Sequence, residues 1–315
     1  MAISLVALSV VVSNLGIGFV QPAEAAGLSV ASRLSASSAP ATMVLHGAKL
    51  HDTTIMQGFA YDTKHNVWIA SQLTQAGRGG LSGTDHARQG NITLTRLSPG
   101  GRELGYMFLR GFGHGVSIGV EPIGTKTYIW TEALAGSNGY GTAIARFEWR
   151  NGATYTAKDV TVYKMNNLQK HQTPAVDAAN NLLVVRYTSE IYGKFRWAYY
   201  KLSDVKARNY TAQRRITRAP YPDAGVQGWT PNGTGGVIEW AGSAYGPDNP
   251  RPGNATLRQV DASGKVIKQT LVTAAPDLEH REPEGATSIG SNVCVGFASG
   301  PAGQRVANIV CQRKL

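Results

Sequence analysis

The chain has 315 residues, of which 42% are hydrophobic and 16% are charged, and this composition excludes a disordered protein. The 31 Lys and Arg residues against 20 Asp and Glu give a formal net charge of +11, which favours polyanionic partners such as an anionic glycopolymer, a phosphate-rich cell surface or nucleic acid. The chain contains 37 Gly and 14 Pro and has no long 3.6-periodic apolar pattern, so helix bundles and Rossmann folds are disfavoured.

The N-terminal segment has the pattern of a secretory signal. Residues 2–20 are almost wholly apolar and are followed by Ala23-Glu24-Ala25, which predicts a signal peptide over residues 1–25. An uncleaved membrane anchor is the alternative, because about nineteen apolar residues can nearly span a bilayer. No Lys or Arg precedes the apolar run, which leaves the true translation start open. Residues 26–41 are rich in Ser and Ala and are predicted to form a flexible leader. We therefore expect a secreted bacterial protein, extracellular or cell-wall associated, with no stable membrane span after cleavage.

An internal repeat decides the architecture. One short motif occurs five times, at intervals of 57, 58, 55 and 57 residues, beginning at Gln57, His114, Gln172, Gln227 and Glu284. A β-rich run follows each copy, and a second hairpin follows four of the five. Four strands in a unit of about 57 residues are typical of a propeller blade.

The two ends of the repeat region complement each other. The fifth unit stops after a third strand at Val306–Cys311, whereas Thr42–Leu45 precedes the first motif as Gln269–Val272 precedes the last. We predict an all-β, five-bladed β-propeller over residues 42–315, closed by an N-terminal strand that completes the last blade. Closure of the ring removes the free sheet edges. An irregular β-sandwich is the alternative interpretation.

Two cysteines lie near the C-terminal end of the sequence. Cys294 and Cys311 stand on two apolar segments joined by a Gly- and Pro-containing turn, which predicts a hairpin with a cross-strand disulfide in an exported chain. Two buried free thiols are the alternative. The sequence contains no zinc-binding Cys/His spacing, phosphate-binding loop, Gly-x-Ser-x-Gly elbow or Rossmann fingerprint, so neither a metal nor a cofactor is expected.

Three motif segments carry a family resemblance. Gln-Gly and His-Gly recur in register in Met56–Asp62, Gly111–Pro122 and Val226–Trp229. In these motifs the chain resembles the propeller family shared by the receptor-binding proteins of staphylococcal phages and the teichoic-acid operon protein TagC. The resemblance covers about Thr42 to Leu315 and implies a role in cell-surface or glycopolymer recognition, without implying a defined reaction.

The first strand of each blade lines the central channel of a propeller, so the five motif residues should form one polar ring: Gln57, His114, Gln172, Gln227 and Glu284. One interpretation is that this ring forms the bottom of a ligand pocket. Of the ring residues, His114 and Glu284 are the only titratable pair suited to proton transfer near neutral pH. The alternative is a purely structural ring, satisfied by its own members and by buried water.

Loops around the channel supply further candidate ligand-binding residues, namely Arg78, Tyr140, Tyr192, Arg196 and Tyr245. Guanidinium groups bind phosphate and carboxylate bidentately, and aromatic rings cover sugar faces. Arg78 lies in the longest polar connection, which we expect to be a loop over residues 72–89. A solvated basic rim is the alternative for any one of these residues.

The leading functional hypothesis is a monomeric propeller that binds a teichoic-acid-like or uronate-containing polymer. Nucleic acid is not expected, because the basic residues form no stripe. The alternative is an enzyme: a polysaccharide lyase with His114 or His171 as base, a Tyr as acid and Arg281 neutralising a uronate, or a glycoside hydrolase. The hydrolase would pair Glu284 with Glu121 or Glu282. A scaffold without a site is the third class, and the sequence leaves open whether the protein is catalytic.

Overall fold

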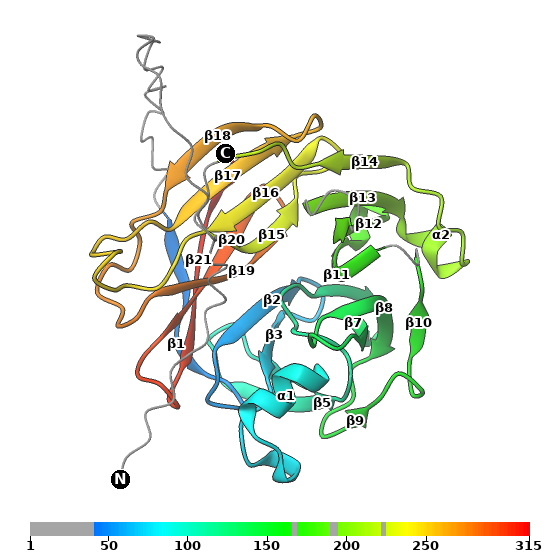
Figure 1. The fold of residues 1–315 in the computed structure, drawn as a ribbon, viewed down its shortest axis with the longest axis horizontal. Helices are drawn as coiled ribbons and strands as arrows, with labels where there is room; N and C mark the ends of the chain where they lie inside the picture. The colour runs from blue at the N-terminus through cyan, green and yellow to red at the C-terminus, as the bar shows by residue number, and fades with distance from the viewer. Residues whose placement is uncertain (1–40, 166–168, 190–194, 222–224) are drawn as a thin grey trace, which may run out of the picture. The chain divides into compact units, whose positions relative to one another are not determined.

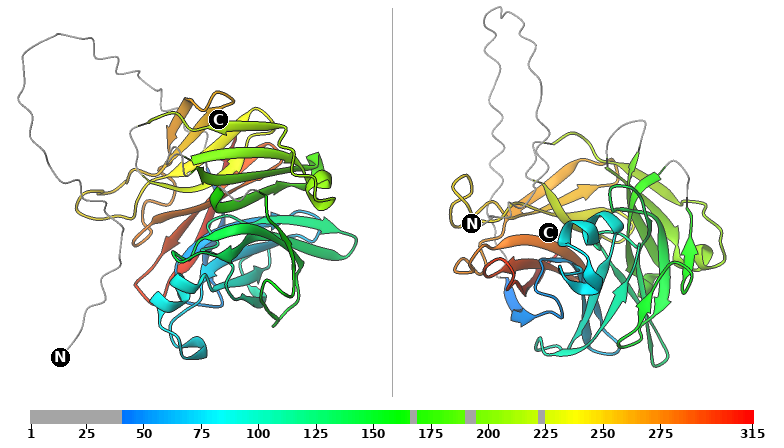
Figure 2. Two further views of the ribbon diagram at one scale, coloured as in Figure 1. Left: turned by 45° about the vertical axis from the view of Figure 1, so that its right-hand side comes forward. Right: turned by 60° about the horizontal axis from the view of Figure 1, so that its bottom comes forward.

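The computed structural model describes residues 41–165, 169–189, 195–221 and 225–315. The predicted signal peptide lies outside these residues, as does the predicted leader apart from Ala41. The strands form five sheets arranged around an axis (Figures 1 and 2). In the ranges given above, no helix is long and apolar enough to cross a bilayer.

Four of the five blades follow the chain in order. Blade 1 contains β2 (Met56–Asp62), β3 (Val67–Leu73), β4 (Ile92–Leu97) and β5 (Glu103–Leu109). Blade 2 contains β6 (Gly119–Ile123), β7 (Lys126–Ala135), β8 (Gly141–Glu148) and β10 (Thr161–Tyr163). Blade 3 contains β11 (Gln169–Asp177), β12 (Leu182–Ser189), β13 (Phe195–Lys201) and β14 (Arg214–Thr217). Blade 4 contains β15 (Val226–Pro231), β16 (Gly236–Ala241), β17 (Thr256–Asp261) and β18 (Val266–Leu271).

The last blade combines both ends of the described chain. Its strands are β19 (Glu282–Ile289), β20 (Asn292–Ser299), β21 (Val306–Arg313) and β1 (Thr42–Lys49), and β1 pairs antiparallel with β21. The buried Asn308 fixes this closure: its Oδ1 accepts the Gly47 N–H at 2.8 Å, and its Nδ2 donates to Ser299 Oγ at 2.8 Å. The predicted five-bladed propeller and its N-terminal closing strand are confirmed.

Each blade places one strand beside the axis. These innermost strands are β2, β6, β11, β15 and β19, each at the end of its sheet and each next to the innermost strands of both neighbouring blades. We call the end of the channel where the innermost strands begin its upper end, and the opposite end its lower end. Blade 2 differs from the prediction, because β6 begins at Gly119 and His114 lies in the segment before it.

Short helical elements lie outside the sheets: η1 (Arg78–Gly80), α1 (Gly83–Gln89), η2 (Ala178–Asn180) and α2 (Leu202–Lys206), with the two-residue strand β9 (Thr154–Tyr155) paired to β5. The expectation of a loop over residues 72–89 was therefore wrong in part. Ser82 Oγ accepts the Asp85 N–H and Asp85 Oδ2 accepts the Ser82 N–H, which forms a capping box that starts α1, and Gly90 ends the helix at φ 67°.

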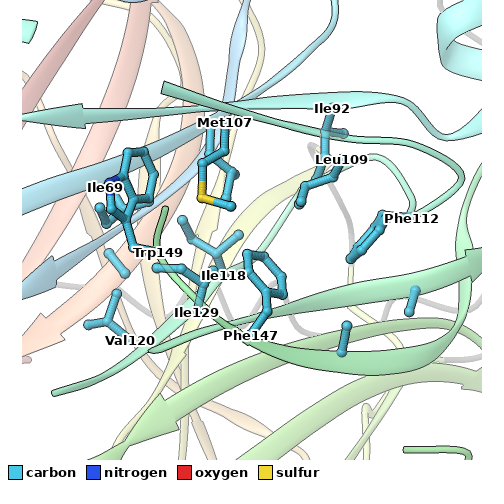
Figure 3. Packing of buried hydrophobic residues seen from close by; sticks show 14 of the residues in the cluster. Ile69, Ile92, Met107, Leu109, Phe112, Ile118, Val120, Ile129, Phe147 and Trp149 are labelled. Atoms are coloured by element: carbon cyan, nitrogen blue, oxygen red, sulfur yellow. The ribbon is translucent and has the colours of Figure 1, made fainter. Parts of the chain in front are cut away.

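The hydrophobic core is divided among the blade interfaces. Each of five clusters of buried side chains draws its members from two successive blades. In the cluster between blades 1 and 2, Ile69 and Leu109 face Ile129 and Phe147 (Figure 3). Because each sheet buries both faces against neighbours, its strands carry continuous apolar runs such as Leu182–Val185.

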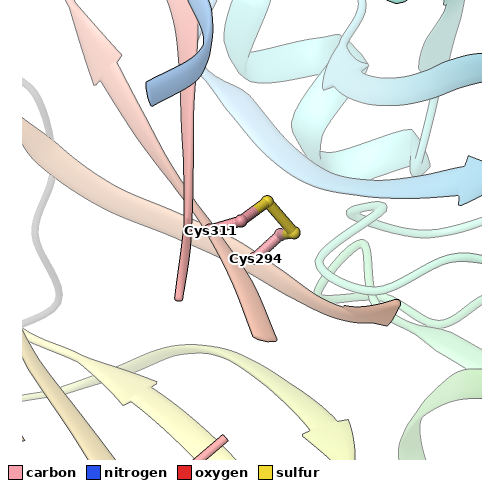
Figure 4. The surroundings of a disulfide bond; sticks show 2 residues. All are labelled: Cys294 and Cys311. Atoms are coloured by element: carbon pink, nitrogen blue, oxygen red, sulfur yellow. A yellow bond between two sulfur atoms is a disulfide. The ribbon is translucent and has the colours of Figure 1, made fainter. Parts of the chain in front are cut away.

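The last blade is also covalently linked. Cys294 on β20 and Cys311 on β21 are direct cross-strand partners with Cα atoms 4.0 Å apart, and they form a disulfide (Figure 4). The bridge lies where β21 also pairs with β1, since Thr42 is opposite Cys311. The described chain contains no free cysteine, so the structure agrees with the predicted cross-strand bridge.

Removal of this bridge is expected to weaken the closure of the ring. The Cys294→Ala/Cys311→Ala double variant should lose about 2–4 kcal/mol of unfolding free energy, because the bridge restricts the unfolded chain and ties β20 to β21. Urea unfolding of the oxidised wild type and of the variant measures the difference. Reductant should destabilise the wild type and leave the variant unchanged. Identical midpoints for the two proteins would contradict the prediction.

Candidate functional site

The innermost strands are irregular at the predicted ring positions. The pairing register shifts between Met56 and Gly58, Lys170 and Thr173, Val226 and Gly228, and Pro283 and Ala286. These shifts enclose Gln57, Gln172, Gln227 and Glu284. A β-bulge leaves a residue outside the ladder and redirects its side chain, so four blades present their motif residue by the same local device.

In four blades the motif residue is followed by a glycine, and the contacts of these glycines explain why Gly recurs in the repeat. A Cβ on Gly58 would lie 2.8 Å from the Gly115 carbonyl oxygen, and a Cβ on Gly228 would lie 2.5 Å from the Gly285 carbonyl carbon. A Cβ on Gly285 would in turn lie 2.9 Å from Gly58 Cα. Adjacent blades therefore touch backbone to backbone at these glycines, and the Gly of the repeated Gln-Gly motif is a blade-to-blade contact.

A buried carboxylate positions the blade 2 segment that contains His114. Glu132 on β7 accepts backbone N–H groups from Gly141 at 2.8 Å, Gly115 at 3.0 Å, His114 at 3.3 Å and Val116 at 3.4 Å. Burial raises the pKa of Glu132, while these four donors act in the opposite direction. The carboxylate thus takes the place of the strand pairing that β6 lacks before Gly119.

Three rings gather at the upper end of the channel. Tyr140, from the connection between β7 and β8, stacks on His114 with ring centroids 4.2 Å apart and contacts His171 at 4.7 Å. Asn138 Nδ2 donates to His171 Nε2 at 2.7 Å, and His171 Nδ1 lies 3.3 Å from Thr188 Oγ1. Burial lowers the pKa of both histidines, so both imidazoles are neutral near neutral pH.

Arg186 on β12 adds a cation to these rings. Its side chain is 9% exposed, and its guanidinium makes no hydrogen bond to any residue that the structure describes. The group lies 4.6 Å from the centre of the Phe195 ring. Burial lowers the pKa of His171 and raises that of Tyr140, and the charge of Arg186 acts to lower both, which places it within electrostatic reach of the stacked rings. Arg186 is therefore a buried cation without a hydrogen-bonding partner in the described part of the chain.

Glu284 is on β19, the innermost strand of the last blade (blade 5), and acts electrostatically on Tyr140 at the upper end of the channel. It is 6% exposed, and no described residue donates a hydrogen bond to it. Burial, and secondarily the charge of Glu282, raises the pKa of Glu284 well above its usual value. Its charge also raises the pKa of Tyr140, although blades 5 and 2 are not neighbours, so the interaction crosses the channel. Gln172 likewise keeps a buried Oε1 without a hydrogen-bonding partner.

The raised pKa of Glu284 sets a pH dependence of stability. Its folded-state pKa exceeds the unfolded value, so the stability contribution is complete below the unfolded pKa and is lost as the pH rises through the folded pKa. Glu284→Gln should therefore exceed the wild type by about 1–3 kcal/mol at mildly alkaline pH and lose this advantage in acid. Thermal unfolding across pH measures this difference. Glu279→Gln, at an exposed carboxylate in the same segment, is the control, and equal pH profiles for all three proteins would contradict the prediction.

Several predicted loop residues are committed to structural contacts. Arg281 is 1% exposed, and its guanidinium donates to the carbonyl oxygens of Val272, Ala274 and Pro252, so its predicted role in neutralising a uronate was wrong. Arg78 donates to the buried Asp52 at 2.6 Å. The hydroxyl of Tyr245 lies within hydrogen-bonding distance of two backbone carbonyls, of Pro276 at 3.2 Å and of Pro252 at 3.3 Å.

Arg196 and Glu121 have contacts elsewhere in their blades. Arg196 is on β13, the third strand of blade 3, opposite Tyr187 and Thr217. Tyr192 lies outside the described residues. Glu121 accepts from Lys206 at 2.6 Å, Arg146 at 2.7 Å and Trp130 at 3.1 Å, and these contacts disfavour the predicted hydrolase pair of Glu284 with Glu121.

Two charged residues at the upper end of the channel were not predicted from the sequence. Glu132 and Arg186 are on the second strands β7 and β12, for which the sequence predicted only β-rich runs. A single charge inside such a run, as in Thr131-Glu132-Ala133 and Val185-Arg186-Tyr187, is the signal that could have found them, because buried charges are rare unless they are paired or functional. Among the described residues, no group of three or more potential ligands could hold a metal ion.

Comparison with known proteins gives three consistent results. Residues 83–213 match the family model of the phage 5-bladed beta propeller receptor binding platform domain. The chain is 26% identical over 279 residues to a Bacillus subtilis (strain 168) protein named for major teichoic acid biosynthesis (protein C), covering 83% of this chain and 60% of that protein. The tail fiber of Staphylococcus aureus phage P68 superposes with a TM-score of 0.70 at 17% identity, covering 88% of this chain and 53% of the fiber.

Proposed function

We propose that this chain binds an anionic glycopolymer at the upper end of its channel. The premise is that it is a five-bladed propeller similar to the phage receptor-binding platform and to a protein named for teichoic acid biosynthesis. The polymer is teichoic-acid-like or contains uronate. The observation that carries this proposal is Arg186, a nine-tenths buried guanidinium without a hydrogen-bonding partner among the described residues.

The chemistry of the site suits a phosphate or carboxylate group. A guanidinium has five N–H donors, and leaving them unpaired in a buried place costs free energy that an anionic oxygen recovers. Tyr140 and the two neutral histidines beside it offer flat faces and hydrogen bonds to sugar hydroxyls. The net charge of +11 attracts polyanions over a longer range.

The setting proposed for this activity is the outside of a bacterial cell. The basic charge and the apolar segment at residues 2–20 support a secreted or cell-wall-associated protein. We propose that it acts as a monomer on polysaccharide or teichoic acid and not on nucleic acid. Both relatives are longer than this chain, so what their names say of them is carried over here only as part of this proposal.

A lyase is the second candidate function, and the stack of His114, Tyr140 and His171 favours it. A neutral imidazole can remove the proton next to a uronate carboxylate, and a tyrosine hydroxyl can protonate the leaving oxygen. Arg186 would take the role first given to Arg281, because it is the cation near these rings.

Titration of the full chain with purified wall teichoic acid and with a panel of uronate polysaccharides tests both candidates. We expect saturable binding that weakens as the salt concentration rises, without any product. Absorbance from unsaturated uronate products, lost in His171→Ala, would establish the lyase in place of a binding protein. Failure to bind any of the polymers at low salt would overturn the proposal.

A further inference from the structure

The lower end of the channel opens into a cavity of about 470 Å³. All five innermost strands contribute to its wall, as do the turns that follow four of them. The wall residues with polar side chains include Tyr61, Thr63, Asp177, Ser288 and Lys314. Pockets for small molecules are typically about 300–1,000 Å³, so this volume suits a small ligand and not a polymer chain.

Small residues bring the backbone of four innermost strands close to the cavity. Ala60, Gly119, Ala175 and Ala286 bring only small side chains to the cavity. Each innermost strand pairs with its second strand along one edge only, so the N–H and C=O groups of its other edge face the channel. Such a wall alternates donors and acceptors around the axis and carries no net charge.

Two opposite charges lie at the cavity wall. Lys314 is half-buried, and no described acid lies within ion-pairing distance of its ammonium group. Burial lowers the pKa of Lys314, whereas the charge of Asp177 acts in the opposite direction. Asp177 accepts hydrogen bonds from the backbone N–H of Asn180 at 3.2 Å and from its side-chain amide at 2.8 Å. The ammonium retains all three donors for a ligand.

We propose that this cavity is a second binding site, independent of Arg186, for a neutral hydroxyl-rich ligand of one or two sugar rings. Hydroxyl groups both donate and accept, which matches the backbone wall and the side chains of Lys314 and Asp177. A multiply anionic ligand does not match, because the wall carries one acid and one base, Asp177 and Lys314. The two ends of the channel therefore differ in chemistry, with a buried cation at the upper end and a neutral, polar wall at the lower end.

The test uses the full chain with glucose, N-acetylglucosamine and their β-linked disaccharides as probes, observed by ligand-detected NMR and calorimetry. Lys314→Ala should weaken binding about tenfold, because it removes a charged hydrogen-bond donor. Thr63→Trp should abolish binding by filling the mouth of the cavity, and it should leave the fold intact because Thr63 is exposed. Arg313→Ala is the matched control, since Arg313 is exposed, adjacent to Lys314 and not part of the wall.

The outcomes separate this site from the upper one. Sugar binding that survives Arg186→Met and Arg313→Ala but fails in Thr63→Trp supports the proposal, whatever happens to polymer binding. The proposal is overturned if the wild type binds none of the probes, if Thr63→Trp binds normally, or if Arg186→Met removes sugar binding. Tighter binding of glucose 6-phosphate than of glucose would overturn the assignment to neutral ligands.

Discussion

Replacement of Arg186 by Met is expected to weaken binding of wall teichoic acid tenfold or more and, at the same time, to raise the melting temperature. The loss of affinity follows from the removal of the charge-assisted hydrogen bonds that a guanidinium makes to phosphate, which contribute about 1.5–3 kcal/mol each. The gain in stability follows because a nine-tenths buried charge without a hydrogen-bonding partner in the described structure is replaced by an apolar side chain of similar length.

The opposite signs of these two effects make the prediction specific. A structural arginine stabilises the fold, so its loss would lower the melting temperature. A binding residue that the free protein leaves unpaired reduces stability, as functional sites often do. We expect an increase of a few degrees, since about 1 kcal/mol corresponds to roughly 2–4 °C in a domain of this size.

Arg214→Met provides the matched control for this experiment. Arg214 is exposed on the outer strand β14 of the same blade and donates to the Thr234 carbonyl at 2.6 Å. Both variants lose one positive charge, so long-range attraction of a polyanion changes equally. Arg214→Met should bind nearly as the wild type does. Equal weakening in the two variants would show that only net charge matters, and unchanged binding by Arg186→Met would refute the role of Arg186.

The second large effect is expected at the glycine contacts between blades. Gly228→Ala should destabilise the propeller by more than about 4 kcal/mol or prevent folding, because this change forces a methyl group into a rigid interface. The new Cβ would lie 2.5 Å from the carbonyl carbon of Gly285 and 2.8 Å from the nitrogen of Ala286. Both are backbone atoms, so no side-chain rotation relieves the clash, and the two blades must separate.

Gly235→Ala is the control for this prediction. Gly235 lies in the turn between β15 and β16, and the nearest atom to a new Cβ would be the Asn232 carbonyl oxygen at 3.8 Å. This variant should stay within about 1 kcal/mol of the wild type. Urea unfolding with intrinsic tryptophan fluorescence compares the proteins, and a Gly228→Ala variant as stable as Gly235→Ala would show that the blades do not meet at this glycine.

The fold could be predicted from the repeat, because a blade other than the last is formed by a continuous segment of the chain. Its four strands are consecutive in blades 1, 3 and 4, so the turns and apolar runs of about 57 residues indicate a sheet without knowledge of its neighbours. The closing pair β1 and β21 could also be inferred, since one unit lacked an outer strand and one extra strand preceded the first unit. Where blade 2 departs from the motif, the local pattern failed, because Glu132 replaces strand pairing with hydrogen bonds from side chain to backbone.

By itself the sequence determined the propeller, the closing strand and the cross-strand partners Cys294 and Cys311. Only the tertiary structure decided which charges are available to a ligand. Arg281 lies in the charged segment His280-Arg281-Glu282 and was expected to meet a ligand, yet its guanidinium meets three backbone carbonyls. The guanidinium of Arg186 meets none among the described residues. The reason is physical: the state of a buried charge depends on atoms from other blades, and no local pattern records where those atoms lie.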